Sequence, residues 1–270
     1  MLKFMRKFWV IASIAALTVS GFTSCSDDDD TPAPEPETPS VKDDMFPYGL
    51  YKTDDIEDIV CNSDGEVTKI KTEWYDYNFE YLNSNKDPNA DVRITITGGY
   101  EGQQIEARLN DDGFISAMRA FLSDRDTALV QIDYEFRYNA DYQLNYVKTR
   151  YKDGYEEEYN QIYSDGDIVA VQYADNNGYE SNWGYGYTDL MHPTPILNKG
   201  GVMLWGEGCY YIDENNFFDY LYLAKLLGKP TKHLPLTDME VSFDWTFNDD
   251  YLPTSFEAPY CPTTITWLSK

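Results

Sequence analysis

Residues 130–147 read VQIDYEFRYNADYQLNYV, and this stretch predicts how the chain folds. Apolar and polar residues alternate strictly here, so that Val130, Ile132, Tyr134, Phe136 and Tyr138 share one face, and Gln131, Asp133, Glu135 and Arg137 share the other. One dry face and one wet face are typical of an antiparallel strand. Asp141 and Tyr142 then favour a turn, after which Leu144 and Val147 re-enter a strand. The stretch therefore predicts a hairpin of antiparallel sheet.

The same turn signal recurs through the chain. An Asp-Gly pair is followed by an apolar residue two positions on and another three later, at Asp64-Gly65, Asp112-Gly113 and Asp165-Gly166, with looser copies at Asp141-Tyr142 and Asp250-Tyr251. Asp and Gly tolerate the positive φ that tight hairpin turns require. Alternating rows also run through Val92, Ile94 and Ile96 and through Val241, Phe243, Trp245 and Phe247, and Lys152-Asp153-Gly154-Tyr155 predicts a further hairpin. A meander of many hairpins follows from these repeats.

One segment breaks the alternation and predicts a helix near residues 215–227. Its apolar residues follow a helical stripe, Asn215 or Asn216 can cap its start, and Gly228 with Pro230 can end it. We therefore expect a mainly β fold, an antiparallel meander curved or closed into a barrel-like sheet, with this one helix covering or plugging it. Residues 47–270 should form a single antiparallel β domain.

The first 24 residues read as a lipoprotein signal peptide. Lys3, Arg6 and Lys7 precede an apolar stretch that is shorter than the roughly 20 residues needed to span a bilayer. Phe22-Thr23-Ser24-Cys25 resembles a bacterial lipobox, which makes Cys25 the lipidation site. A plain secretory signal with a chance cysteine is the alternative.

Residues 25–46 read as an acidic, Pro-rich disordered tether. Residues 31–40 read TPAPEPETPS, which favours a semi-rigid polyproline II spacer without core-forming residues. The acidic run Asp27–Asp30 resembles the surface-export tag of Bacteroidota lipoproteins, and Ser26 resembles an outer-membrane sorting choice. We expect a protein anchored by lipid to the outer membrane and facing the cell exterior, with the periplasmic leaflet as the alternative.

Composition excludes some partners and leaves others open. The formal net charge of −26 becomes −29 once residues 1–24, with three basic residues and no acid, are removed. Such a surface repels phosphate backbones and anionic head groups, so we expect no nucleic acid, and membrane attachment only through the lipid. Cys61, Cys209 and Cys261 remain after lipidation, so at most one disulfide forms.

The Asp-Gly meander, the lone late helix and the run from Leu227 to Pro235, LGKPTKHLP, resemble an uncharacterised Bacteroidota lipoprotein family described as having a porin-like fold. The resemblance covers about residues 61–256. It implies an architecture, and it supplies no activity and no catalytic residues.

Catalytic and metal-binding signals are absent from the sequence. His192 and His233, the two histidines, stand in predicted loops, and neither a His-Glu-x-x-His pair nor a Gly-x-Ser-x-Gly elbow is present. Acidic turns at residues 111–113, 165–167 and 175–177 offer calcium ligands but lack the twelve-residue loop pattern. We therefore expect no enzyme, no metal and no cofactor, although two acids on the inner face of neighbouring strands would support glycoside hydrolysis.

Residues 176–195 read NNGYESNWGYGYTDLMHPTP and form the first candidate for ligand binding. Tyr179, Trp183, Tyr185 and Tyr187 offer flat rings that can stack on sugars, and Trp205 is a second candidate. The alternative is a connection whose aromatic residues fold back over the sheet or the helix. The leading hypothesis is a non-catalytic module that binds a glycan or similar nutrient and can pass it to an outer-membrane transport complex. A carrier of an apolar small molecule, or a structural envelope lipoprotein, is the other.

Overall fold

The computed structural model describes residues 40–82, 89–98, 103–123, 129–205, 217–238, 242–257 and 262–268. Contacts divide the chain after Thr38, and all of these residues belong to the unit Pro39–Lys270. The predicted signal peptide, Cys25, most of the tether, Cys209 and Cys261 lie outside the described residues.

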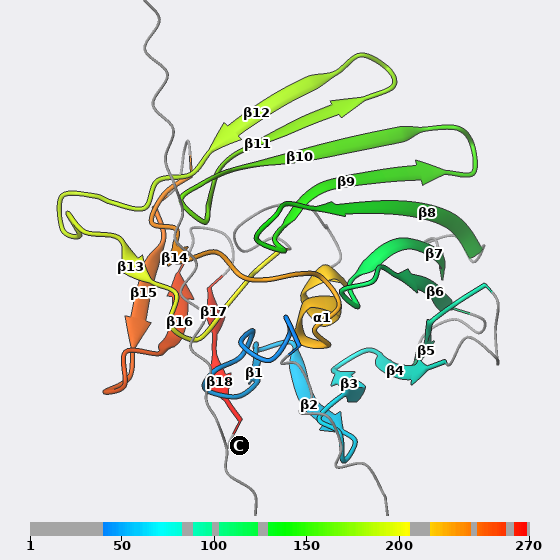
Figure 1. Ribbon diagram of the computed structural model, residues 1–270, viewed down its shortest axis with the longest axis horizontal. Coiled ribbons are helices and arrows are strands. Elements are labelled where there is room, and N and C mark those ends of the chain that lie inside the picture. The colour runs from blue at the N-terminus through cyan, green and yellow to red at the C-terminus, as the bar shows by residue number, and fades with distance from the viewer. Residues whose placement is uncertain are drawn as a thin grey trace, which may run out of the picture. The chain divides into compact units, whose positions relative to one another are not determined.

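An antiparallel sheet of eleven strands, β2 to β12, dominates the described residues. Each strand pairs with the one before it and the one after it in the sequence, so the sheet is a meander, and it curves around α1 (Figure 1). Hydrogen bonds do not close it into a ring, because β2 and β12 lie at its two edges. The strands are β2 Ile56–Cys61, β3 Val67–Thr72, β4 Asp76–Tyr81, β5 Val92–Thr97, β6 Gln104–Leu109, β7 Ile115–Ser123, β8 Leu129–Tyr138, β9 Leu144–Tyr151, β10 Glu156–Ser164, β11 Asp167–Asp175 and β12 Glu180–Gly184. The predicted mainly β meander with one helix is confirmed.

Three small antiparallel sheets complete the described strands. β1 (Tyr51–Lys52) pairs with β18 (Thr266–Trp267), and β13 (Ile196–Leu197) pairs with β14 (His233–Leu234). The third sheet holds β15 (Asp244–Phe247), β16 (Pro253–Glu257) and β17 (Thr263–Thr264). Residues 244–247 of the predicted row 241–247 therefore belong to a separate sheet, Phe243 lies just before β15, and Val241 lies outside the described residues.

One turn design connects several hairpins. An Asn or Asp side-chain oxygen accepts the backbone N–H groups two and four residues later, and the residue between them, three positions on, has positive φ. The accepting residues are Asn62, Asn110, Asn139, Asp175 and Asn248, and the positive-φ residues are Gly65, Gly113, Tyr142, Gly178 and Tyr251. Such a pattern matches a type I turn followed by a bulge residue in the left-handed region.

The turn at Asp165-Gly166 differs from these five. Both of its central residues have positive φ, 51° and 87°, and Ser164 pairs directly with Asp167. A two-residue turn of this kind matches the right-handed twist of the strands that it joins.

The concave face of the main sheet forms the core. Val92, Ile94 and Ile96 of β5 and Phe136 of β8 are buried, as the alternation predicts. Arg93, Asp133 and Glu135 point to the opposite, convex side, because successive residues of a strand face opposite ways.

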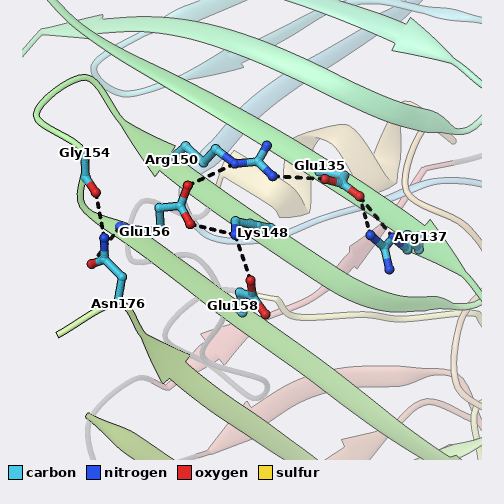
Figure 2. Close-up of polar contacts among 8 residues, drawn as sticks. All are labelled: Glu135, Arg137, Lys148, Arg150, Gly154, Glu156, Glu158 and Asn176. Carbon is cyan, nitrogen blue, oxygen red and sulfur yellow. Dashed lines mark hydrogen bonds and ion pairs between the residues drawn. The ribbon is translucent and has the colours of Figure 1, made fainter. Parts of the chain in front are cut away.

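The convex face carries ladders of ion pairs between neighbouring strands. Figure 2 shows Arg150 between Glu135 and Glu156, with distances of 3.3 and 3.2 Å, and Lys148 between Glu156 and Glu158, with distances of 2.7 and 2.8 Å. Glu135 also pairs with Arg137, and these pairs hold the pKa of Glu135 below its usual range. A charged face of this kind suits water rather than the hydrocarbon of a membrane.

Helix α1 spans Phe217–Leu223 and lies against the concave face. Six of its seven residues are buried, and Phe218 meets the rings of Tyr134 and Phe136 at centroid distances of 5.9 and 5.5 Å. The helix ends earlier than residue 227, because Lys225 takes a left-handed φ of 58° and Leu226 N donates back to Leu221 O. The predicted caps Asn215 and Asn216 lie outside the described residues.

Residues 227–235, which follow the helix, form hydrogen bonds with residues at the β8–β9 and β10–β11 turns of the main sheet. Gln143 Nε2 donates to Gly166 O and to Pro230 O, at 2.8 and 2.9 Å. His233 Nδ1 lies 2.7 Å from Asp167 Oδ2, and His233 N donates to Asp167 Oδ1. The LGKPTKHLP run thus crosses and holds two neighbouring turns.

The start of the described chain is packed against the domain. Met45 and Phe46, next to the expected boundary at residue 47, are buried in the core. Gly201 has a φ of 72°, and a Cβ there would lie 2.2 Å from Met45 O, so only glycine fits this approach.

Candidate functional site

A pocket of about 640 Å³ opens between the concave face and α1. Its walls come from a loop, from several strands of the main sheet and from the helix. The lining residues are Asp55, Thr72, Glu73, Trp74, Tyr75, Tyr77, Ile96, Gln103, Leu122, Val130, Ile132, Tyr151, Phe217 and Tyr220. A concave, largely apolar site with a few polar groups has the size and character of a small-molecule site.

Aromatic rings form one wall of this pocket. The Tyr77 ring lies 4.6 Å from the Tyr220 ring and 6.1 Å from the Phe217 ring, and the Tyr75 ring lies 6.4 Å from the Tyr77 ring. Strand β4 and helix α1 thus bring together residues far apart in the sequence. The tilted arrangement is one that aromatic pairs favour, and it fixes the rings in place.

Trp74 stands at the rim of the pocket. It lies in the tight β3–β4 connection, which Thr72 fixes by donating from Oγ1 to Tyr75 O and accepting from Tyr75 N, both at 3.0 Å. With 71% of its surface exposed, Trp74 presents its ring to solvent beside the pocket.

Polar groups meet the aromatic wall at Asp55. Tyr220 Oη donates to Asp55 Oδ2 at 2.6 Å, and Thr53 Oγ1 donates to Asp55 Oδ1. Burial and the neighbouring Asp55 carboxylate raise the pKa of Tyr220 well above its usual range, so the phenol keeps its proton. Asp55 is therefore held in a fixed position beside the rings.

A tyrosine–carboxylate cluster adjoins the pocket through Tyr151. Glu157 of β10 and Asp175 of β11 are directly opposite each other on the concave face. Glu157 accepts hydrogen bonds from Tyr151, Tyr155 and Tyr173 at 3.2, 3.2 and 3.0 Å, and the Tyr155 hydroxyl also lies 3.2 Å from Asp175 Oδ2. Two inner-face acids on neighbouring strands are the arrangement that the sequence analysis named as support for hydrolysis.

The aromatic segment 176–195 does not gather into one surface. Tyr179 is 62% exposed and meets the Tyr173 ring, whereas Tyr185 is buried and its hydroxyl accepts a hydrogen bond from Trp183 Nε1 at 2.8 Å. The half-buried Tyr187 donates to Ile168 O at 2.9 Å.

Trp205 is fully buried, and its backbone N donates to Asp219 Oδ1 at 2.6 Å. The structure therefore brings Trp183 and Tyr185 together through a hydrogen bond, and of the five predicted residues only Tyr179 is largely exposed.

The acidic turns and the histidines have structural partners. Asp175 Oδ1 accepts turn N–H groups, Asp165 pairs with Lys232, and Asp167 pairs with His233. Within the described ranges, no group of three or more His, Cys, Asp or Glu side chains is placed to hold a metal ion. His192 Nδ1 lies 3.2 Å from Asp189 in an exposed turn, and Cys61 is an exposed free thiol.

The pocket residues were missed by the sequence analysis. Asp55, Trp74, Gln103 and Tyr220 belong to four different elements or connections, and no spacing motif relates them. The one available signal was the period-two pattern, which places Val130, Ile132 and Ile96 on the inner face but does not show which inner residues border a cavity.

No helix among the described residues combines the length and the apolar character needed to cross a membrane.

Comparison with known proteins gives a family and a fold. The family model described as "Domain of unknown function (DUF4595) with porin-like fold" matches residues 56–257. Among solved structures, a porin-like protein from Bacteroides uniformis is similar, with a TM-score of 0.58 and 16% identity over 83% of this chain and 97% of that chain. A porin-like protein from Bacteroides vulgatus gives a TM-score of 0.49 and 14% identity over 78% and 91%. None of the curated proteins matches the chain.

Proposed function

This chain belongs to the DUF4595 family of domains of unknown function with a porin-like fold, and we propose that it is a lipid-anchored, non-catalytic binding module of the bacterial outer membrane. Its ligand is a small molecule with an apolar face, a glycan or a similar nutrient, held in the pocket between the concave face and α1.

The observation that carries this proposal is the pocket itself. Five rings, those of Tyr75, Tyr77, Tyr151, Phe217 and Tyr220, line a space of about 640 Å³, with Trp74 exposed at its rim. Flat rings offer rigid contact area at little entropic cost, and Asp55, Glu73 and Gln103 add hydrogen-bonding groups that fix an orientation. A pocket of this size accommodates a molecule of about a disaccharide or a small amphiphile.

The membrane anchor is supported by the first 40 residues of the sequence. A short apolar signal, the lipobox-like Cys25 and an acidic, Pro-rich tether together favour an acylated protein that stands away from the membrane. Facing the cell exterior, such a domain would meet nutrients before a transport complex does.

Ligand-induced changes in melting temperature, followed by calorimetric titration, test the binding proposal. The purified protein is screened against neutral oligosaccharides and small aromatic compounds. Trp74→Ala should weaken the binding of any hit by roughly tenfold or more, because stacking on an exposed ring is lost. Tyr251→Ala, which removes another largely exposed ring that does not line the pocket, should leave binding unchanged.

The outcomes separate two sites on the molecule. Loss of binding in Tyr179→Ala or Trp183→Ala, with Trp74→Ala unaffected, would move the site to the 176–195 segment. A complete lack of ligand-induced stabilisation across the panel would refute the binding proposal.

Two other functions have distinct signatures. A carrier of an apolar molecule would retain co-purifying lipid in native mass spectrometry. Glycoside hydrolysis is the other candidate, because the carboxylates of Glu157 and Asp175 lie opposite each other on neighbouring strands. It would appear as a release of reducing sugar that Glu157→Gln abolishes.

A further inference from the structure

The charges of the main sheet are distributed unequally between its two faces. On the convex face of β8 to β10, Glu135, Glu156 and Glu158 all pair with arginine or lysine within 3.3 Å (Figure 2). Asp133 pairs with Arg119, and Glu106 with Arg93, in the same cross-strand manner. The negative charges of these five acids are therefore balanced by basic residues on the same or neighbouring strands.

Acids on the pocket side lack such compensation. Asp55 and Glu73 line the pocket, and Glu157 and Asp175 lie beside it on the concave face. Among the residues that the structure describes, none of these four carboxylates takes part in an ion pair. Asp55, Glu157 and Asp175 accept hydrogen bonds from hydroxyl or backbone groups, and Glu73 is exposed. Of the lining residues that the structure describes, none is lysine, arginine or histidine.

Aromatic rings add to the same electrostatic preference. The faces of tyrosine and tryptophan rings carry partial negative charge and attract a cation placed within about 6 Å of the ring centroid. Tyr75, Tyr77 and Tyr220 offer such rings inside the pocket, and Trp74 offers one at the entrance. The excess of 26 negative charges over the whole sequence acts in the same direction at long range.

From this charge pattern we infer that the pocket selects an organic cation, a primary amine or a quaternary ammonium group carried on an apolar or aromatic body. The inference rests on the proposed function and names the chemical class of its ligand. The apolar body packs against Ile96, Val130 and Ile132, and the cationic group lies between the ring faces and the carboxylates of Asp55 and Glu73. An anionic ligand of the same shape is excluded, because it would be buried beside acids without a counter-ion.

Three probes of nearly equal size test this preference: 2-phenylethylamine, which is a cation at neutral pH, the neutral 2-phenylethanol, and the anion phenylacetate. Each is titrated into the purified full-length mature protein at low ionic strength by calorimetry. The cation should bind about tenfold tighter than the alcohol, the expected size for a cation among aromatic rings and carboxylates, and the anion should not bind measurably. Added salt should reduce the difference, because Glu73 is exposed and screened.

A matched pair of charge variants separates the local effect from the overall charge. Glu73→Gln removes an exposed carboxylate that lines the pocket, and it should reduce the preference for the amine over the alcohol by roughly threefold. Glu80→Gln removes an exposed carboxylate from the convex side of β4 and changes net charge equally, and it should leave the preference unchanged. Neither variant removes a partner of the part-buried hydrogen bond from Tyr220 to Asp55.

The results distinguish this inference from the function on which it rests. If the alcohol or phenylacetate bound as tightly as the amine or more tightly, the cation preference would be refuted, while the proposed binding function would still hold. Equal effects of the two variants would also refute it, because the preference would then come from net charge alone. A lack of binding by all three probes and by the wider panel would refute both.

Discussion

The ammonium group of Lys42 lies in a largely buried position. Its Nζ donates to Gly113 O at 2.5 Å and lies 5.3 Å from the centroid of the Phe114 ring. Burial, helped by the positive charge of Lys225, lowers the pKa of Lys42 to about 8. The folded protein therefore gives up this proton at lower pH than the unfolded chain does.

The pH dependence of stability should reveal this lysine. Between about pH 8 and 10.5 the unfolded chain binds more protons at this residue than the folded protein, so the free energy of unfolding rises with pH through that window. We expect the native protein to gain stability relative to Lys42→Met as pH rises, since the variant lacks the titration while sharing all others. Denaturant unfolding at a series of pH values measures the difference, and a flat difference would show that Lys42 titrates normally.

At the scale of elements, the turns show how much of the fold a sequence pattern reveals. Alternation correctly predicted β5 and β8, and the Asp-Gly pairs correctly marked the turns at Gly65, Gly113 and Gly166. The side chain that organises most of these turns stands two residues earlier, as Asn110 does before Asp112 and Gly113. The sequence pattern does not single out this asparagine, because Asn, Asp and Gly are all frequent in turns. Only the three-dimensional structure shows which side chain accepts the hydrogen bonds.

Removal of one such acceptor should weaken its hairpin. Asn110 Oδ1 accepts from Asp112 N and from Phe114 N, and Phe114 is fully buried. Asn110→Ala should lower the free energy of unfolding by about 1–2 kcal/mol, while Asn110→Asp, which keeps the accepting oxygen, should lie close to the native value. Urea unfolding of the two variants provides the comparison, and equal losses in both would contradict the role of the oxygen.

At the scale of the whole molecule, the curvature of the main sheet creates the pocket, which the sequence pattern does not predict. Inner-face residues were predictable one strand at a time, yet the pocket depends on how far the sheet bends and where α1 sits against it. Tyr77 and Tyr220 are separated by a large part of the chain, and their rings lie 4.6 Å apart only because the meander wraps around the helix. Glu157 and Asp175 likewise became a pair only through the register of β10 and β11.

The proposed anchor makes a prediction for the entire protein. Cys25→Ala should move the protein from the membrane fraction to the soluble fraction and abolish incorporation of labelled fatty acid, because a stable anchor requires the acyl chains. Cys61→Ala removes an exposed free thiol of the folded domain and should leave both properties unchanged. Persistence of Cys25→Ala in the membrane fraction would point to another mode of attachment.

The strict neighbour order of β2 to β12 has a kinetic consequence. Each strand finds its partner a short loop away, so pairing proceeds strand by strand with little entropy lost to loop closure at any step. Other contacts join distant parts of the chain, and the longest separation is at Tyr51, which pairs with Trp267, and at Asp54, to which Thr264 N donates across 210 positions. Because closing so long a loop costs the most entropy, we expect the contacts of residues 51–54 with residues 264–267 to form after the meander has assembled.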